Sequence, residues 1–211
     1  MSESVKAWQR ALGVTADGDF GPHTLAASLA LLPAQTGAGP EPDRSRGDQL
    51  PWIAEGLKVL GLHETRDNAA LRAWLKSDGK TLGDPSALPW CGDYVETCIK
   101  AALPFEPFIG ALATNPYFAR NWGTFGESCI LAYGCIVVFE RGPNSGHVGF
   151  AVGQDADNIY VLGGNQGDAV SVVRIAHHRL LATRWPVTWT GDPQPCPAMT
   201  PGTIPTSVNE F

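Results

Sequence analysis

The stretch His147-Val148-Gly149-Phe150-Ala151-Val152 is followed, after the short loop Asp155-Ala156-Asp157, by Ile159-Tyr160-Val161-Leu162-Gly163. Both runs are rich in β-branched and aromatic residues, and a tight polar loop between two such runs is typical of a β-hairpin. If the loop is centred on Ala156, His147 lies directly opposite Asn165. Directly opposed side chains lie on the same face of a sheet, with Cβ atoms about 5 Å apart. A slip of one residue in the turn would undo this pairing.

Three further runs have strand character and are separated by short segments rich in Gly, Asp and Asn. They cover residues 135–139, 170–175 and about 181–187. The chain before them has helical spacing instead, with apolar residues at Trp52, Ile53, Leu57 and Leu60 and again at Leu71, Trp74 and Leu75. Helices followed by strands in hairpins predict an α+β domain whose antiparallel sheet is a meander.

Composition divides the 211-residue chain into four segments. Residues 1–32 favour helix. Residues 33–48 contain three prolines and no large apolar residue, which is typical of an extended linker. Residues 49–190 form the main domain. Residues 191–211 form a proline-rich tail that we expect to be irregular, either lying on the surface or mobile.

The charge of the chain disfavours some classes of partner. The net charge is −6, from 15 basic and 21 acidic residues, and Lys and Arg do not cluster. Unassisted binding to nucleic acid or anionic lipid is therefore disfavoured. No apolar run approaches the ~18 residues of a membrane span, and the beginning, Met1-Ser2-Glu3-Ser4, lacks the features of a secretory signal. We expect a soluble, cytoplasmic monomer.

The number and spacing of the cysteines limit the chemistry that the chain can carry out. The five cysteines are Cys91, Cys98, Cys129, Cys135 and Cys196. An odd number without a signal argues against a disulfide framework. No pair has the two-residue spacing typical of a structural zinc site. The sequence therefore predicts no metal and no other cofactor. It also predicts that most of the thiols are buried and that one of them is a candidate nucleophile.

That candidate is Cys91, in the stretch Leu88-Pro89-Trp90-Cys91-Gly92-Asp93-Tyr94-Val95. Pro89 disfavours helical backbone at Leu88, so a helix is predicted to begin just after the proline. Apolar residues then recur with helical spacing at Tyr94, Val95, Cys98 and Ala102. Cys91 thus falls in the first turn, where unpaired N–H groups and the helix dipole would lower the pKa of its thiol and could donate to an oxyanion.

A purely structural role for Cys91 stays open. A lone cysteine is most often a small buried hydrophobe, and the nearby carboxylate of Asp93 would raise the pKa of the thiol. Gly92 favours the catalytic interpretation, because it removes a side chain that would crowd an incoming carbonyl group. We interpret Cys98, Cys129 and Cys135 as packing residues in apolar surroundings.

A partner for Cys91 is predicted on the hairpin. His147 shares one face with the small residues Gly149, Ala151 and Gly163, and these leave space for a helix. We predict that the helix of Cys91 lies against this face with its thiol near His147. Asn165 would accept from one ring nitrogen, so that the other meets the sulfur. Taken singly, an Asn in a glycine-rich turn and a His at a strand end are more often without such a role.

Four segments in order, residues 89–95, 134–139, 146–150 and 162–166, resemble the CHAP and NlpC-type superfamily of cysteine amidohydrolases and peptidases. The resemblance covers about residues 50–187 and implies a papain-like fold that cuts amide bonds in peptidoglycan. It implies Cys91 as nucleophile, His147 as general base and Asn165 as third polar residue, and we expect Trp90 to contact substrate. Many CHAP members have a Glu shortly before that Asn. This chain has Gly163 there, so neither a carboxylate-assisted His nor a calcium site is implied.

Residues 5–12 and 17–24 resemble the peptidoglycan-binding domain found on bacterial and phage wall hydrolases. The glycines of the turn at 17–21 suit positive φ angles, and Thr24 can cap a second helix. The resemblance implies wall binding, with Asp17, Phe20 and Thr24 as motif residues. That family usually adds a third helix, which is replaced here by the linker, so a short module that binds weakly or docks on the main domain stays open.

Together these resemblances predict an endolysin-like peptidoglycan hydrolase that cleaves an amide bond of the stem peptide by a Cys-His-Asn mechanism. Such a protein would stay in the cytoplasm until it is released to the cell wall through a holin or by lysis of the host. Three alternatives stay open: a non-catalytic wall-binding protein with a decayed hydrolase fold, an injected antibacterial amidase, and a cysteine transferase or deubiquitinase-like protease. Whether the bond joins sugar to peptide or two amino acids is left undetermined.

Overall fold

The structure is a computed structural model that describes residues 3–18, 24 and 50–199. Its α-helices are α1 (Glu3–Ala11), α3 (Pro51–Leu57), α4 (Asn68–Leu75), α5 (Cys91–Ala102) and α6 (Gly110–Thr114), and its 3-10 helices are η1 (Ala119–Thr124) and η2 (His177–Arg179). The strands are β1 (Glu127–Ser128), β2 (Ile136–Gly142), β3 (Ser145–Gln154), β4 (Asn158–Gly163), β5 (Ser171–Ala176) and β6 (Leu180–Trp185). The predicted mixture of helices and antiparallel sheet is confirmed.

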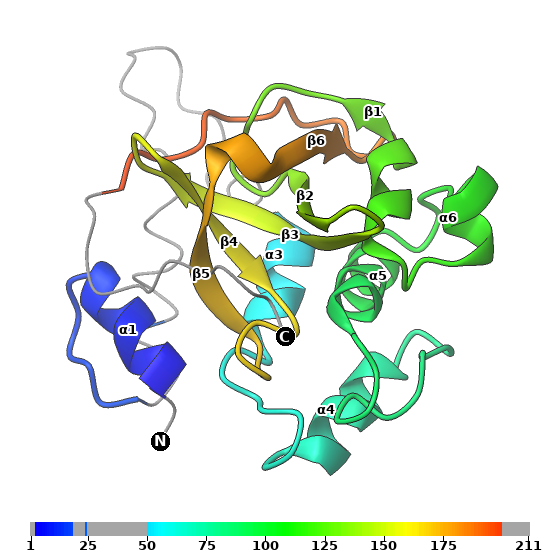
Figure 1. The fold of residues 1–211 in the computed structure, drawn as a ribbon. Coiled ribbons are helices and arrows are strands. Elements are labelled where there is room, and N and C mark those ends of the chain that lie inside the picture. The colour runs from blue at the N-terminus through cyan, green and yellow to red at the C-terminus, as the bar shows by residue number, and fades with distance from the viewer. Residues whose placement is uncertain (1–2, 19–23, 25–49, 200–211) are drawn as a thin grey trace.

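All six strands form one antiparallel sheet in the order β1-β6-β2-β3-β4-β5 (Figure 1). Strands β2 to β5 are the predicted meander. The prediction is wrong for β6, which pairs with β2 at the other side of the meander. The turn η2 redirects the chain after β5, and there the guanidinium of Arg179 donates to the carbonyl of Glu140 on β2 over 3.0 Å.

The register of the central hairpin agrees with the prediction in the part of the β3–β4 ladder that lies away from the turn. Phe150 lies opposite Leu162, and Ala151 lies opposite Val161. A bulge between Ala151 and Gly153 then shifts the pairing by one residue toward the turn. The strand β4 ends at Gly163, so the predicted pairing does not continue as far as Asn165.

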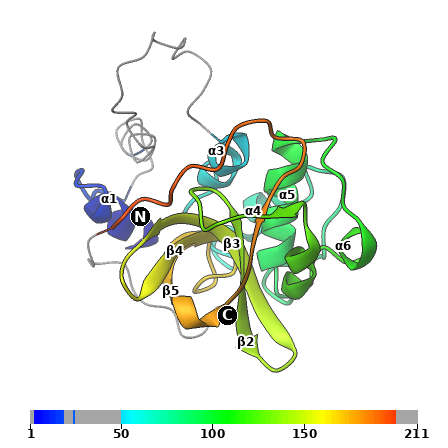
Figure 2. The same ribbon diagram turned by 90° about the horizontal axis from the view of Figure 1, so that it is seen from above.

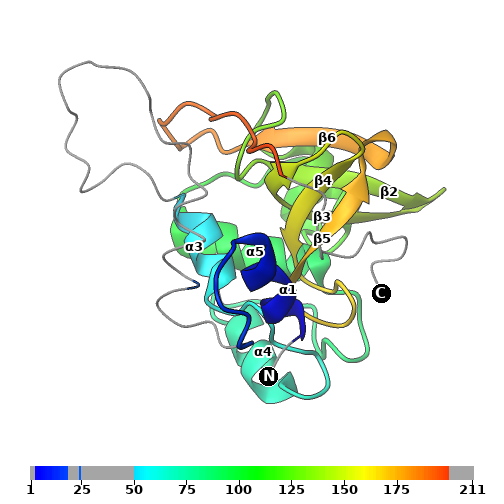
Figure 3. The ribbon, with the colours of Figure 1, turned by 90° about the vertical axis from the view of Figure 1, so that its left-hand side faces the viewer.

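Helix α5 is the central helix of the molecule. It contacts α3 and α4 on one side and strands β3 and β4 on the other, and the α-helices lie together beside the sheet in Figure 3. Its first nine residues are buried, including Asp93 and Glu96, so burial extends beyond the predicted apolar stripe. This position places the first turn of α5, with Cys91, against the centre of the sheet.

The two ends of the described chain lie against the sheet as well. Helix α1 packs on the edge strand β5, and its Val5 belongs to the hydrophobic core (Figure 2). The irregular segment 194–199 lies beside the end of β3. There the backbone N–H of Gln154 donates to Pro197 O over 2.8 Å, and the carbonyl oxygen of Gln154 accepts from Met199 N over 2.7 Å. The predicted second helix near the N-terminus, the linker 33–48 and the end of the tail lie outside the described residues.

Candidate functional site

Cys91 is the first residue of α5, as Pro89 predicts. The preceding residue, Trp90, accepts the first helical hydrogen bond from Tyr94 N over 2.9 Å. Its indole N–H donates to Glu64 Oε2 over 2.8 Å, and a Cβ on Gly164 would lie 2.4 Å from its ring. Trp90 is only 1% exposed. The side chain expected to contact substrate is thus packed beneath the site, where it supports the start of α5.

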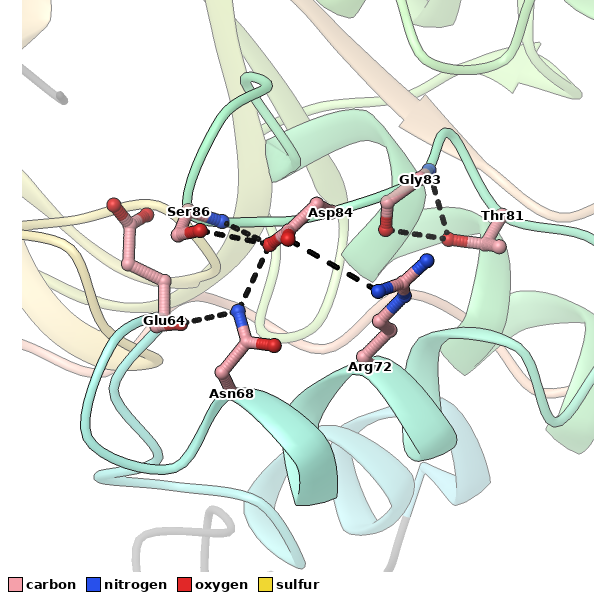
Figure 4. A network of polar contacts seen from close by, with 7 residues as sticks. All are labelled: Glu64, Asn68, Arg72, Thr81, Gly83, Asp84 and Ser86. Carbon is pink, nitrogen blue, oxygen red and sulfur yellow. Dashed lines mark hydrogen bonds and ion pairs between the residues drawn. The ribbon is translucent and has the colours of Figure 1, made fainter.

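The loop before Trp90 is tied to α4 by a network centred on Asp84 (Figure 4). Asp84 Oδ1 accepts from Asn68 Nδ2 over 2.9 Å and from the amide and hydroxyl of Ser86 over 3.0 and 2.8 Å. Hydrogen bonds from Asn68 first, and then from Ser86, lower the pKa of Asp84 below its ordinary value. The network therefore holds the loop that leads into the first turn of α5, which carries Cys91.

Gly92 has a role in packing. A Cβ at this position would lie 2.5 Å from the carbonyl oxygen of Pro116 and 2.6 Å from that of Tyr117. The missing side chain thus lets the segment before η1 pack on the first turn of α5. A close approach of backbone is a common reason for glycine in a helix.

Helix α5 covers the face of the hairpin opposite to the predicted one. The rings of Tyr94 and Phe150 are 6.2 Å apart, and Phe150 points away from the His147 face because side chains alternate along a strand. Gly149 and Gly163 bring the strands themselves together, since a Cβ on Gly149 would lie 3.5 Å from the Cα of Gly163. The glycine that admits α5 is Gly164, beside Tyr94.

Cys91 nevertheless reaches strand β3 beside His147, at the edge of the strand. The backbone of Ala151 bonds toward β2, to Gly134 and Cys135. Val148 has the alternate orientation, so its N–H points to the side of β4. This N–H donates to the Cys91 thiol. The Cys91 sulfur therefore takes the place of the backbone acceptor that a longer β4 would have offered to Val148. It lies next to Val148, the residue after His147.

The pKa of the Cys91 thiol is raised above its ordinary value, which corrects the predicted lowering. Burial is the largest cause, because Cys91 is only 3% exposed and a thiolate is poorly solvated there. Hydrogen bonds from the backbone of Val148, Gly92 and Cys91, and the charge of Arg141, act in the opposite direction. The donors expected at the helix N-terminus are thus present but are outweighed by desolvation.

The imidazole of His147 is fully buried and hydrogen-bonds to Gln166, whereas the predicted partner was Asn165. His147 Nε2 lies 2.9 Å from Gln166 Oε1. Asn165 has a positive φ of 57°, and this left-handed residue turns the chain out of the line of β4. The next side chain, that of Gln166, then returns toward the imidazole. The sequence places Gln166 beside the predicted residue, but nothing in its pattern distinguishes the two amides.

The other end of the Gln166 amide determines the tautomer of His147. Gln166 Nε2 donates to Ser171 O over 2.6 Å and to Val161 O over 3.2 Å. Because these acceptors require the amide nitrogen, Oε1 must face the imidazole, and it can only accept. His147 Nε2 therefore carries the proton, and Nδ1 carries the lone pair. This is the tautomer of a base that acts through Nδ1.

Two buried carboxyl groups lie on α5 close to Cys91. Asp93 Oδ2 accepts from Thr81 Oγ1 and Leu82 N, both over 2.9 Å. Burial is the largest cause that raises the pKa of Asp93 to about 6 and that of Glu96 to about 7. The negative charge of Asp78 raises both further. These acids therefore titrate near neutral pH beneath the first two turns of α5.

The N-terminal motif residues form a network around Gln9, which is 1% exposed. Its amide nitrogen donates to Asp17 Oδ1 over 2.6 Å and to Thr24 Oγ1 over 2.7 Å, and its oxygen accepts from Gly18 N over 2.8 Å. Thr24 is buried as well. Asp17 and Thr24 are thus brought together by a side chain that the sequence analysis had not assigned, whereas Phe20 lies outside the described residues.

The described residues contain no group of three or more His, Cys, Asp or Glu side chains arranged to hold a metal ion. In the same part of the chain, none of the helices has the length and apolar character that crossing a bilayer requires. Comparison of the chain with protein-family models, with curated proteins and with solved structures finds no match.

Proposed function

We propose that the chain is a cysteine peptidoglycan hydrolase of papain-like arrangement, in which Cys91 is the nucleophile and His147 the general base. The observation that carries the proposal is the meeting of α5 with β3. The Cys91 thiol accepts from Val148 N, and the adjacent His147 has its tautomer determined by Gln166. A thiol at a helix N-terminus, an imidazole and an orienting amide are the parts that nucleophilic catalysis by cysteine needs.

The reaction follows from these parts. His147 Nδ1 takes the proton of the Cys91 thiol, and the sulfur attacks the carbonyl carbon of the substrate amide. The tetrahedral oxyanion is stabilised by N–H groups at the beginning of α5. The imidazolium gives its proton to the leaving amine, which leaves a thioester on Cys91. His147 then activates water, which hydrolyses the thioester and restores the thiol. Gln166 keeps Nε2 protonated throughout.

The raised pKa of Cys91 fits this sequence of steps. With a neutral thiol in the resting enzyme, the proton must move to His147 as the sulfur attacks, so the imidazole has to be correctly oriented at that moment. Orientation is the contribution that Gln166 makes, because its amide is held from both sides. In this proposal Gln166 is a positioning residue in place of the expected Asn165.

Peptidoglycan as substrate rests on resemblance in both parts of the chain. The segments around Cys91, His147 and Gln166 resemble wall amidohydrolases, and the segments 5–12 and 17–24 resemble a wall-binding module. The hydrogen bonds of Gln9 with Asp17 and Thr24 join residues of both segments. An amide bond of the stem peptide is therefore the proposed target.

The test is digestion of purified sacculi, with release of soluble muropeptides as the readout and their masses to identify the bond. Cys91→Ala and Cys91→Ser are expected to abolish release while the protein stays folded by thermal unfolding. Cys98→Ala removes a buried thiol from the same helix and is expected to keep activity once its stability loss is taken into account. A fully active Cys91→Ala would refute the proposal.

One observation favours a second candidate, a non-catalytic wall-binding protein with a decayed hydrolase fold. The residue Cys91 is only 3% exposed, so substrate must displace part of the surroundings to reach its thiol. Pelleting of the protein with sacculi without release of muropeptides, in the wild type and in Cys91→Ala alike, would favour this candidate over the enzyme.

A further inference from the structure

A glycine lies directly beside the amide that orients the proposed base. Gly163 is the last residue of β4, and it pairs with Ser171 on β5. A Cβ on Gly163 would lie 2.8 Å from Gln166 Oε1, 3.1 Å from Gln166 Cδ and 3.4 Å from His147 Nε2. We propose that Gly163 is a positioning residue, because the space left by its missing side chain is the seat of the Gln166 amide. This role rests on the proposed function, in which His147 is the general base.

The register of β4 directs position 163 toward the imidazole. Leu162 pairs with Phe150 on β3, so these two side chains lie on one face of the sheet. Successive side chains of a strand point to opposite faces. A side chain at Gly163 would therefore lie on the other face, which is the face of His147. The Gln166 amide occupies the place that this side chain would take.

Hydrogen bonds hold the Gln166 amide from both of its ends. Its oxygen lies 2.9 Å from His147 Nε2, and its nitrogen donates to Ser171 O over 2.6 Å and to Val161 O over 3.2 Å. The main chain of Gln166 is held as well, since its N–H donates to Ala169 O and its carbonyl accepts from Ser171 Oγ, both over 3.0 Å. An oxygen 2.8 Å from a new Cβ has to move, and that oxygen is the one that bonds to His147.

The backbone does not require glycine at this position. Gly163 is not one of the residues with a positive φ angle, which is the conformation that favours glycine. The atoms nearest to a new Cβ belong to the side chains of Gln166 and His147. At Gly149, by contrast, a Cβ would lie 2.8 Å from the backbone oxygen of Leu162. Alanine at position 163 is therefore expected to displace a side chain and to leave the fold intact.

The displaced amide would release the tautomer of His147. His147 Nε2 stays protonated because Gln166 Oε1 can only accept. Without this acceptor the proton can move to Nδ1. In that tautomer Nδ1 has no lone pair with which to take the proton of the Cys91 thiol. An effect on the rate is thus expected from a residue that contacts neither the thiol nor the substrate.

The first measurement is the nitrogen-15 NMR spectrum of full-length protein with labelled histidines, in which the variant His147→Asn assigns the signals. Wild type is expected to have Nε2 protonated, and Gly163→Ala to have the proton shared with Nδ1 or moved to it. The midpoint of thermal unfolding is expected to stay within about 3 °C of wild type. Gly123→Ala is the matched control, since its new Cβ would meet only the Cβ of Ala182 at 3.9 Å, and it is expected to leave the imidazole signals unchanged.

The second measurement is the rate of muropeptide release, in a cycle of two substitutions. Gly163→Ala and Gln166→Ala are each expected to lower the rate by roughly 10- to 100-fold, and Gly123→Ala to keep it. The double variant Gly163→Ala/Gln166→Ala is expected to be no slower than Gln166→Ala alone, because both changes remove the same hydrogen bond. A merely structural effect of Gly163 would instead multiply with that of Gln166.

Three results would overturn the inference. They are unchanged imidazole signals in Gly163→Ala, changed signals together with a wild-type rate, and losses that multiply in the double variant. Failure of the proposed function gives a different result, in which wild type releases no muropeptides. In that case the imidazole signals of Gly163→Ala still decide whether Gly163 is the seat of the amide.

Discussion

His147 Nε2 lies 2.9 Å from Gln166 Oε1, and the amide nitrogen of the same glutamine donates to the carbonyl oxygens of Ser171 and Val161. The amide can therefore adopt only one orientation, and the imidazole only one neutral tautomer. A single side chain thus links the turn after β4 to the protonation pattern of the proposed base.

Gln166→Ala is expected to lower the rate of muropeptide release by roughly 10- to 100-fold, a share of what a positioned general base contributes. The physical reason is that His147 loses the acceptor that keeps Nε2 protonated. Nitrogen-15 chemical shifts of the imidazole measure the tautomer directly. Asn165→Gly, which keeps the left-handed backbone, is expected to change neither readout. If Asn165→Gly lowers the rate while Gln166→Ala does not, Asn165 and not Gln166 is the residue that orients the imidazole.

Gly92→Ala is expected to destabilise the protein by at least about 2 kcal/mol in urea unfolding, because the new Cβ would meet two backbone carbonyl oxygens. The same change in an exposed helix would stabilise by about 1 kcal/mol. Gly123→Ala is the control, since its nearest neighbour would be the Cβ of Ala182 at 3.9 Å. Equal stability of Gly92→Ala and wild type would contradict the packing described for the first turn of α5.

The buried acids of α5 predict a pH dependence of stability. The folded-state pKa values are about 6 for Asp93 and about 7 for Glu96, against ordinary values of 3.8 and 4.5. The folded protein binds these protons more tightly than the unfolded chain, so the free energy of unfolding falls as pH rises from about 4 to 7. The double variant Asp93→Asn/Glu96→Gln should remove this fall and be about 1–2 kcal/mol more stable than wild type at pH 8.

Asp157→Asn, at an exposed acid in the hairpin loop, serves as the control for this change. It should follow the wild-type pH profile of unfolding. Asp93→Asn keeps an oxygen that accepts from Thr81 and Leu82, so a loss of stability at every pH would show that the charge itself is needed in the fold.

The loop before α5 is expected to depend on Asp84. Asp84→Ala removes the acceptor shared by Asn68 and Ser86, and should lower both the midpoint of thermal unfolding and the rate of wall digestion. Asp84→Asn keeps an acceptor oxygen and should lie close to wild type. Because the pKa of Asp84 is lowered in the folded protein, its contribution to stability is present above the ordinary carboxyl pKa and is lost as pH falls through the lowered value. If Asp84→Ala unfolds at the wild-type midpoint and digests walls at the wild-type rate, the network contributes neither to stability nor to the site.

Brief alkylation with iodoacetamide at pH 7 is expected to label Cys129 before Cys91. Cys129 is half-buried and has a lowered pKa, whereas Cys91 is buried and has a raised one. Peptide mapping by mass spectrometry gives the order of labelling. Activity should survive labelling of Cys129 and decline only as Cys91 is modified. Rapid, selective labelling of Cys91 would instead mean that its thiol is activated and reachable in the resting protein.

Local patterns predicted the elements well, because each depends on neighbours in the chain. Five strands were expected from runs of β-branched and aromatic residues, and all five are present. The start of α5 at Cys91 follows from Pro89, which excludes helical backbone before it. The hairpin register also follows from a short loop, and it holds for the pairs of Phe150 and Ala151, before the bulge shifts it.

Three features of the structure depend on contacts between segments that are distant in the sequence. The strand β6 pairs with β2, α5 covers the face of Phe150, and Gln166 replaces Asn165 beside His147. Alternation along β3 defines two faces but does not say which of them a helix will cover. A single left-handed residue, Asn165, changes which of two adjacent amides points inward.

The amino-acid sequence alone was sufficient for the class of fold, the first turn that carries Cys91 and the strand that begins near His147, since periodicity and turn chemistry act over a few residues. Tertiary structure decided how thiol and imidazole are supported: by the amide that orients the base, by the burial that raises the pKa of the thiol, and by the loop tied through Asp84. Hydrogen-bond partners and desolvation are properties of surroundings assembled from separate segments, and no local pattern specifies them.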